Sequence, residues 1–199
     1  MIGDPETLLE EMPDSPDLFR SYRALIATGH KRVSGGWEYN NRFYPDYLTM
    51  GGAVFGAFRV AEKYCKGKGL DIGASYWPFP GATAIDTAYG PGKTALSDIP
   101  EGSQDYVFSS HTLEHIAQWQ KALESWVGKL RKGGTLFLYL PHPECWLWRK
   151  ENPFMARHHA WVPAPEIVKK ALTNMGCTIM AFDDDPDVMQ SFFVCGRKG

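Results

Sequence analysis

The sequence has no excess of positive charge. Its 199 residues include 21 lysines and arginines against 23 aspartates and glutamates, which gives a formal net charge of −2. Bulk attraction to nucleic-acid phosphates or to an anionic membrane is therefore excluded as a means of binding. Long apolar runs are also missing, because stretches such as Thr135–Leu140 fall far short of the roughly 20 residues that span a bilayer. We therefore expect neither a membrane nor a nucleic acid as partner.

Closely spaced cysteine pairs and a secretory leader are absent as well. The four cysteines are far apart, without a C-x-x-C pair: Cys65, Cys145, Cys177 and Cys195. They are expected to be reduced thiols, because a chain of this size can form a core without disulfides. The first residues are acidic where a signal peptide would be basic and then apolar, so a cytoplasmic location is predicted.

The N-terminal region differs in character from the rest. Residues 1–66 are predicted to form a helical and aromatic cap that packs on a core domain of residues 67–199. Apolar spacing favours helices over Leu18–Ala27 and Tyr47–Tyr64. An aromatic run that includes Trp37 and Tyr39 lies between them, after a turn at Ser34–Gly36.

From residue 67 onward, short apolar runs alternate with amphipathic segments, which is typical of βα units and a mostly parallel sheet. The expected strands are Leu70–Gly73, Ala82–Asp86, Tyr106–Ser109, Thr135–Leu140, Thr178–Phe182 and Ser191–Cys195. Helices are expected at Trp119–Leu130 and Pro165–Asn174. The turn-like stretch Asp183–Asp187 separates the last two strands and predicts that they pair in antiparallel fashion.

Acidic residues lie near the carboxyl ends of the first two expected strands. Asp71 is followed by Gly73 in a D-x-G turn, which lets a ligand approach the backbone closely. The G-x-G-x-x-G phosphate cradle is missing, so a nicotinamide dinucleotide fits less well than a ligand that carries an ammonium group. Asp86 could hold ribose hydroxyls, and Asp98 with Ile99 could meet an adenine. An ordinary βα turn and a plain loop acid remain the structural alternatives for Asp71 and Asp98.

Two further segments complete a pattern. Residues 102–116 read GSQDYVFSSHTLEHI, and residues 130–142 read LRKGGTLFLYLPH. In this order and spacing, with the D-x-G turn and the acid of the second strand, the region from Gly67 to Lys198 resembles the class I S-adenosylmethionine-dependent methyltransferases of type 11. The resemblance implies a Rossmann-like three-layer α/β sandwich. Its seven-stranded, mainly parallel sheet has an antiparallel last strand and binds S-adenosyl-L-methionine.

The resemblance assigns cofactor contacts position by position. They are Asp71, Gly73, Ala74, Ser75, Asp86, Thr87, Asp98, Ile99, Ser109 and Ser110. Two features depart from the family pattern. Ser75 stands where many members have a second glycine, and the connection from Asp71 to Asp86 is short and holds two prolines. A loop is therefore expected in place of the first crossover helix.

Histidines in the two segments that carry the family resemblance, residues 102–116 and 130–142, are the candidates for acid–base chemistry. His111 follows the strand that approaches the cofactor and is the candidate general base. The other candidates, expected to contact the acceptor, are Glu114, His115, His142, Trp37 and Tyr39. The alternative for Glu114 and His115 is to organise the start of the next helix by hydrogen bonding.

The insertion over residues 143–163 is rich in tryptophan and basic residues and is predicted to be either a lid or an interface. A metal site is the alternative for His142–Cys145, His158, His159 and the acids of Asp183–Asp187. None is expected, because their spacing matches no closed zinc pattern.

The sequence thus predicts an S-adenosylmethionine-dependent methyltransferase that acts on a small-molecule or glycan-type acceptor. A hydroxyl acceptor is preferred because a histidine base is available. An RNA or protein methyltransferase and a non-catalytic cofactor-binding scaffold are the alternatives. Whether the chain forms a homodimer stays open.

Overall fold

The computed structural model describes residues 31–39, 42–45, 54–74, 78–86, 94–145, 159–187 and 190–199. The chain divides into two compact units, residues 1–52 with 146–159 and residues 53–145 with 160–199. This division falls after residue 52, whereas the sequence placed a boundary after residue 66. Among the described residues, no helix has the length and apolar character needed to cross a membrane.

The first unit contains a three-stranded antiparallel meander, β1 (Lys31–Val33), β2 (Gly36–Tyr39) and β3 (Arg42–Pro45). The sequence predicted a helical and aromatic cap for residues 1–66 but no strands in this stretch. Aromatic residues are enriched in strands because they fit a pleated surface, and β2 and β3 each hold two of them. Lys31 pairs with Glu38, and Trp37 pairs with Tyr44. The helix predicted at Leu18–Ala27 lies outside the described residues.

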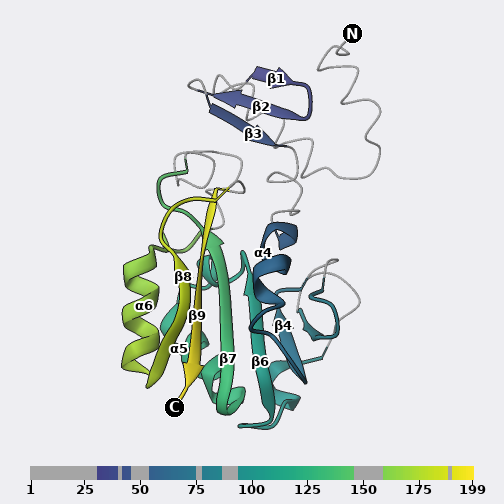
Figure 1. Cartoon of the computed structure of the whole chain (residues 1–199), viewed down its shortest axis with the longest axis vertical. Coiled ribbons are helices and arrows are strands. Elements are labelled where there is room, and N and C mark those ends of the chain that lie inside the picture. Colours follow the sequence, from purple (N-terminus) through teal and green to yellow (C-terminus); the bar gives the residue numbers. More distant parts are fainter. Residues whose placement is uncertain are drawn as a thin grey trace. The chain divides into compact units, whose positions relative to one another are not determined.

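The second unit contains a six-stranded sheet in the order β5-β4-β6-β7-β9-β8 (Figure 1). Its strands are β4 (Gly69–Ile72), β5 (Thr83–Ile85), β6 (Gln104–Ser110), β7 (Leu130–Pro141), β8 (Cys177–Asp183) and β9 (Ser191–Lys198). The pairs β4–β5, β4–β6 and β6–β7 are parallel, whereas β9 is antiparallel to both neighbours. The predicted reversal of the last strand is confirmed. The described residues supply six of the seven strands that the resemblance implies.

The helices of this unit are α4 (Val54–Ala61), α5 (Trp119–Lys129) and α6 (Pro165–Asn174). Two short 3-10 turns, η1 (Leu96–Asp98) and η2 (Leu113–His115), precede and follow β6. The predictions for α5 and α6 are confirmed to within one residue. The helix predicted over Tyr47–Tyr64 was too long at its C-terminal end, because α4 stops at Ala61 and turns follow.

Strand alternation gives the sheet two different faces. On one face, β6 places Phe108 against Phe58 of α4 and against Phe137 of β7, with ring centroids 6.1 and 5.8 Å apart. The other face is mostly aliphatic, and its buried residues form one cluster with those of α5 and α6. That cluster includes Val107, Leu123, Leu136, Leu138, Val168, Leu172 and Val194. The sheet is therefore covered on both sides, and its carboxyl strand ends are left for a ligand site.

Candidate cofactor and acceptor site

The D-x-G turn joins the carboxyl ends of β4 and β5. The Gly73 N–H donates to the Ile85 carbonyl oxygen at 2.8 Å, and Asp86 follows directly after β5. Gly73 has φ +81°, and a Cβ at this position would overlap the Thr112 side chain. The turn therefore packs against the loop that follows β6. Asp71, Asp86 and the residues of that loop thus lie together at the carboxyl ends of the parallel strands.

Asp71 uses its carboxylate inside the protein. Its Oδ2 accepts a hydrogen bond from the Phe79 N–H at 2.6 Å, and the side chain is buried. Burial raises the pKa of this carboxyl to about 7, and the nearby Asp86 charge also raises it, while the Phe79 bond lowers it. Asp71 thus organises the short connection to β5, where a crossover helix is common in the family it resembles. Pro78 and Phe79 are indeed in non-helical backbone, as predicted.

The two serines at the end of β6 have different surroundings. The Ser109 hydroxyl is buried and donates to the Ile72 carbonyl oxygen at 2.8 Å, which ties β6 to β4. The Ser110 hydroxyl is also buried, but it has no hydrogen-bond partner. A buried hydroxyl without a partner is costly, so Ser110 is suited to a ligand contact.

A buried lysine holds the segment around Ile99. Lys129 at the end of α5 donates to the Ile99 carbonyl oxygen at 2.9 Å and pairs with Glu101. Ile99 packs against the aliphatic cluster, whereas Asp98 is exposed at the end of η1. Lys129 is not among the site residues predicted from the sequence, since only the fold brings its ammonium group to this loop.

His111 lies where β6 ends and has φ +48°, a backbone conformation that residues other than glycine rarely adopt. Its N–H donates to the Tyr139 carbonyl oxygen at 2.9 Å, and its Nε2 lies 2.9 Å from Ser191 Oγ. Its Nδ1 lies 3.6 Å from Glu114 Oε1. Strained backbone of this kind gathers at functional sites, which fits the role predicted for this ring.

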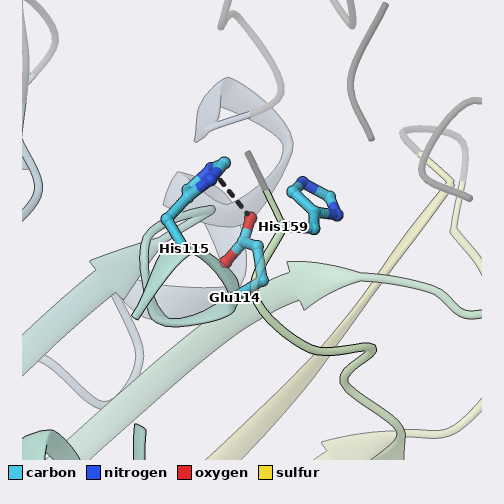
Figure 2. A group of neighbouring side chains, drawn as sticks. All are labelled: Glu114, His115 and His159. Atoms are coloured by element: carbon cyan, nitrogen blue, oxygen red, sulfur yellow. Dashed lines mark ion pairs between the residues drawn. The ribbon is translucent and has the colours of Figure 1, made fainter. Parts of the chain in front are cut away.

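Glu114 and His115 form most of η2, and Figure 2 shows their side chains with the contact between them dashed. The Glu114 side chain is fully buried, and its Oε1 lies 3.8 Å from His115 Nε2. Burial raises the pKa of Glu114 to about 8. Neither carboxylate oxygen accepts a hydrogen bond of ordinary geometry, so Glu114 does not cap the following helix.

His142 uses both ring nitrogens within the second unit. Nε2 lies 3.0 Å from the Asp184 carbonyl oxygen, and Nδ1 accepts the Glu144 N–H at 3.2 Å. The ring is buried against Phe192. These contacts connect the end of β7 to the β8–β9 hairpin, and they favour a structural role over the predicted contact with an acceptor.

The remaining candidates are only partly described. Ser75 and Thr87 lie outside the described residues, as do the side chains of Trp37 and Tyr39. Ala74 is buried directly after Gly73. Of the 143–163 insertion, Trp161 stacks on Trp119 with ring centroids 4.2 Å apart and donates from Nε1 to the Leu113 carbonyl oxygen. This tryptophan supports η2 from the side of α5.

The residues at the strand ends fit S-adenosylmethionine. Asp86 is partly buried, and its carboxylate can accept two hydroxyl protons of a ribose. An acid at the carboxyl end of β5, in a sequence without a G-x-G-x-x-G phosphate cradle, suits a ligand that carries positive charge. The partnerless Ser110 hydroxyl supplies a donor on the neighbouring strand end.

Comparison with known proteins agrees with this assignment. Residues 82–138 match the family model described as a methyltransferase domain. No curated protein matches the chain. The solved structure of an S-adenosylmethionine-dependent methyltransferase from Archaeoglobus fulgidus is similar, with a TM-score of 0.60, 17% identity and coverage of 74% of this chain and 94% of that one.

Two further solved structures share the fold. One is an S-adenosylmethionine-dependent methyltransferase from Mesorhizobium loti, with a TM-score of 0.54, 16% identity and coverage of 75% of this chain and 100% of that one. The other is the 1,6-didemethyltoxoflavin-N1-methyltransferase of Burkholderia thailandensis with bound 1,6-didemethyltoxoflavin and S-adenosylhomocysteine. Its TM-score is 0.53 at 14% identity, with coverage of 76% and 78% of the two chains. The second unit therefore has the fold of the S-adenosylmethionine-dependent methyltransferases, and residues 82–138 within it match the model of a methyltransferase domain.

Proposed function

We propose that the chain transfers a methyl group from S-adenosylmethionine to a hydroxyl group of a small-molecule or glycan-type acceptor. The observation that carries the proposal is the joining of the D-x-G turn, Asp86 and the loop of residues 110–112 at one edge of the sheet. The four free, buried cysteines support the cytoplasmic location predicted from the sequence.

The cofactor site is proposed to consist of residues predicted from the sequence. Some of them contact the cofactor directly, and others hold the turn and the strand end in place. Gly73, Asp86 and Ser110 are proposed to contact the cofactor directly. Asp71 and Ser109 hold the turn and strand end in place, because each already bonds to the neighbouring backbone. Ile99 offers an apolar side chain for the adenine, from a loop that Lys129 holds.

The bound cofactor supplies an electrophilic methyl group on a sulfonium, so the protein needs to align a nucleophile and exclude water. His111 is proposed to accept the proton of the attacking hydroxyl. Its ring is held by Ser191 and lies against Tyr139, with ring centroids 5.5 Å apart. A ring fixed in this way keeps its nitrogens in one orientation, which general-base catalysis requires.

Calorimetric titration with S-adenosylmethionine and S-adenosylhomocysteine tests the cofactor site. We expect both to bind the wild-type protein and binding to be lost in Asp86→Ala, while Asp185→Ala, which removes an exposed acid of the β8–β9 turn, binds as the wild type does. A folded wild-type protein that binds neither compound would overturn the proposal.

The acceptor class is tested by following S-adenosylhomocysteine release with panels of sugars, phenols and amines. Turnover with hydroxyl compounds is expected. Turnover with amines alone would refute the hydroxyl assignment, and cofactor binding without turnover on any panel would favour the scaffold alternative. Sedimentation of the same sample decides whether the chain forms a homodimer.

A further inference from the structure

Glu114 is a buried acid without a hydrogen bond to its side chain. The side chain is fully buried, and neither carboxylate oxygen has a hydrogen-bond partner. An ionised carboxylate in such surroundings carries a large desolvation penalty, and a neutral carboxyl loses the hydrogen bonds it would make in water. Packing alone does not explain an acid at this position, so a task for its carboxyl group is required.

Two hydrogen bonds hold the η2 turn that carries Glu114. The Ala160 N–H donates to the Glu114 carbonyl oxygen at 2.8 Å, and Trp161 donates from Nε1 to the Leu113 carbonyl oxygen at 2.9 Å. Ala160 and Trp161 belong to the second unit, as η2 does. The position of the carboxylate is therefore fixed within one compact unit.

The His111 ring lies between this carboxylate and a serine hydroxyl, which are also in the second unit. Its Nδ1 is 3.6 Å from Glu114 Oε1, and its Nε2 is 2.9 Å from Ser191 Oγ. The His111 side chain is 15% exposed, whereas that of Glu114 is not exposed at all. An acceptor can therefore meet His111, and Glu114 can act only through that ring.

The two nitrogens of the His111 ring have different roles. Ser191 Oγ is at hydrogen-bond distance from Nε2, whereas the Glu114 oxygens accept no hydrogen bond. We therefore assign the proton of the neutral ring to Nε2, which leaves the lone pair that takes up a proton on Nδ1. Nδ1 and Glu114 Oε1 then face each other across 3.6 Å, which is longer than a hydrogen bond. A proton between them would be attracted by both atoms.

We propose that Glu114 is a positioning residue that shares with His111 Nδ1 the proton taken from the acceptor. This step rests on the proposed function. Methyl transfer breaks a carbon–sulfur bond of the cofactor and forms a carbon–oxygen bond to the acceptor. The hydroxyl proton passes to Nδ1 of His111. The resulting imidazolium lies beside the Glu114 carboxylate, whose opposite charge stabilises it.

The proton affinities of the two groups are suited to a shared proton. Burial raises the pKa of Glu114 to about 8, whereas a free imidazole has a pKa of about 6.5. The buried carboxyl therefore binds a proton at least as readily as an imidazole does, which is the reverse of their order in water. Because both groups attract the same proton, the Glu114–His111 pair is expected to take it up at a higher pH than His111 alone would.

Nitrogen NMR of protein with labelled histidines tests the pair without any need for activity. The His111 signals are identified by their loss in His111→Asn. Ring protonation is then followed against pH in the wild type and in Glu114→Gln, which is neutral and similar in shape. We expect the wild-type ring to take up its proton about one pH unit or more above the ring of Glu114→Gln. The neutral wild-type ring is expected to carry its proton on Nε2.

Matched variants separate the loss of this partner from a general change of charge. Glu124→Gln removes an exposed acid of α5 and is expected to leave the His111 titration as in the wild type. His115→Gln removes the other imidazole of the second unit near Glu114, with Nε2 3.8 Å from Oε1, and the same result is expected. An effect of His115→Gln as large as that of Glu114→Gln would assign the carboxylate to His115 and overturn the proposal.

A further titratable group lies against the His111 ring and stays constant in this series. It is Tyr139, whose ring centroid is 5.5 Å from that of His111 and whose hydroxyl donates to Asp187 at 2.7 Å. Neither Tyr139 nor Asp187 is changed in the variants, so a difference between the wild type and Glu114→Gln reports on the carboxylate.

Two NMR results would overturn the Glu114–His111 pair. One is the same titration of the ring in the wild type and in folded Glu114→Gln. The other is a neutral ring with its proton on Nδ1, which is measured on the wild type and does not depend on how a variant folds.

Turnover keeps the pair and the proposed function apart. With a hydroxyl acceptor, kcat of Glu114→Gln is expected to fall by about tenfold or more, with the affinity for S-adenosylmethionine unchanged. A titration that depends on Glu114, in a protein that methylates no hydroxyl, would contradict the proposed acceptor and leave the proton-sharing pair standing. Hydroxyl methylation with a His111 titration that does not depend on Glu114 would contradict the pair alone.

Discussion

The Asp71 carboxylate accepts a hydrogen bond from the Phe79 N–H at 2.6 Å and thereby fixes the short connection between β4 and β5. This bond places Phe79 in the aromatic face of the sheet, where its ring lies 4.7 Å from Phe108 and 5.4 Å from Phe58. One carboxylate thus links the D-x-G turn to the core. The family that the chain resembles commonly has a helix at this position.

The raised pKa of Asp71 predicts a pH dependence of stability. Its pKa rises from 3.8 unfolded to about 7 in the folded protein, mainly through burial. Between these values the folded state binds a proton that the unfolded state has released, so the free energy of unfolding falls as pH rises through this window. The slope reaches about 1.4 kcal/mol per pH unit at most.

Asp71→Asn isolates this contribution, since an amide oxygen can still accept the Phe79 N–H. We expect the free energy of unfolding of the variant to fall less steeply with pH, with the difference from the wild type growing up to about pH 7. Urea unfolding of both proteins at several pH values measures it. Subtraction of the two curves removes the effect of Glu114, whose pKa is also raised. A difference that does not change with pH would contradict the buried, proton-binding carboxyl.

Phe79→Ala is expected to destabilise the second unit strongly. The ring is 3% exposed and contacts Phe58, Phe108 and Tyr106. Removal of such a ring costs about 3–5 kcal/mol, through lost burial and the cavity that remains. Phe182→Ala is the matched control, because that ring is 50% exposed on β8 and contacts Lys169 only by a cation–π interaction, worth about 0.5–1 kcal/mol. Equal losses in the two variants would show that the short connection does not pack as described.

Gly73→Ala and Gly81→Ala form a second matched pair. Both glycines have φ +81°, so alanine brings a similar backbone cost of about 1–2 kcal/mol at each. Only at Gly73 would the added Cβ overlap Thr112; at Gly81 nothing lies within 4 Å. We expect Gly81→Ala to bind S-adenosylmethionine as the wild type does and Gly73→Ala to lose binding, measured by calorimetry on folded samples. Retained binding in Gly73→Ala would separate the turn from the cofactor site.

The sequence predicted the elements whose signals are local. The helix predicted at Pro165–Asn174 has those bounds in the structure, and apolar runs predicted the strands of the six-stranded sheet. The meander of β1–β3 was missed, since short aromatic strands carry little periodicity. The contact of Asp71 with Phe79 and the bond from Lys129 to the Ile99 carbonyl depend on how separate segments meet, and no spacing in the sequence encodes them.

Ser191→Ala tests whether the serine orients the candidate base. Ser191 is fully buried at the start of β9, and its Oγ lies 2.9 Å from His111 Nε2. Without that hydroxyl the ring loses one of the contacts that fix its orientation, so we expect kcat with a hydroxyl acceptor to fall by about tenfold, against 100-fold or more for His111→Asn. The affinity for S-adenosylmethionine should stay unchanged in both, because neither residue is assigned to the cofactor.

The single variants and their double mutant are compared by S-adenosylhomocysteine release. If the serine acts through His111, its loss adds little in the His111→Asn background. A full additional tenfold loss there, or a change confined to KM, would contradict this role for Ser191.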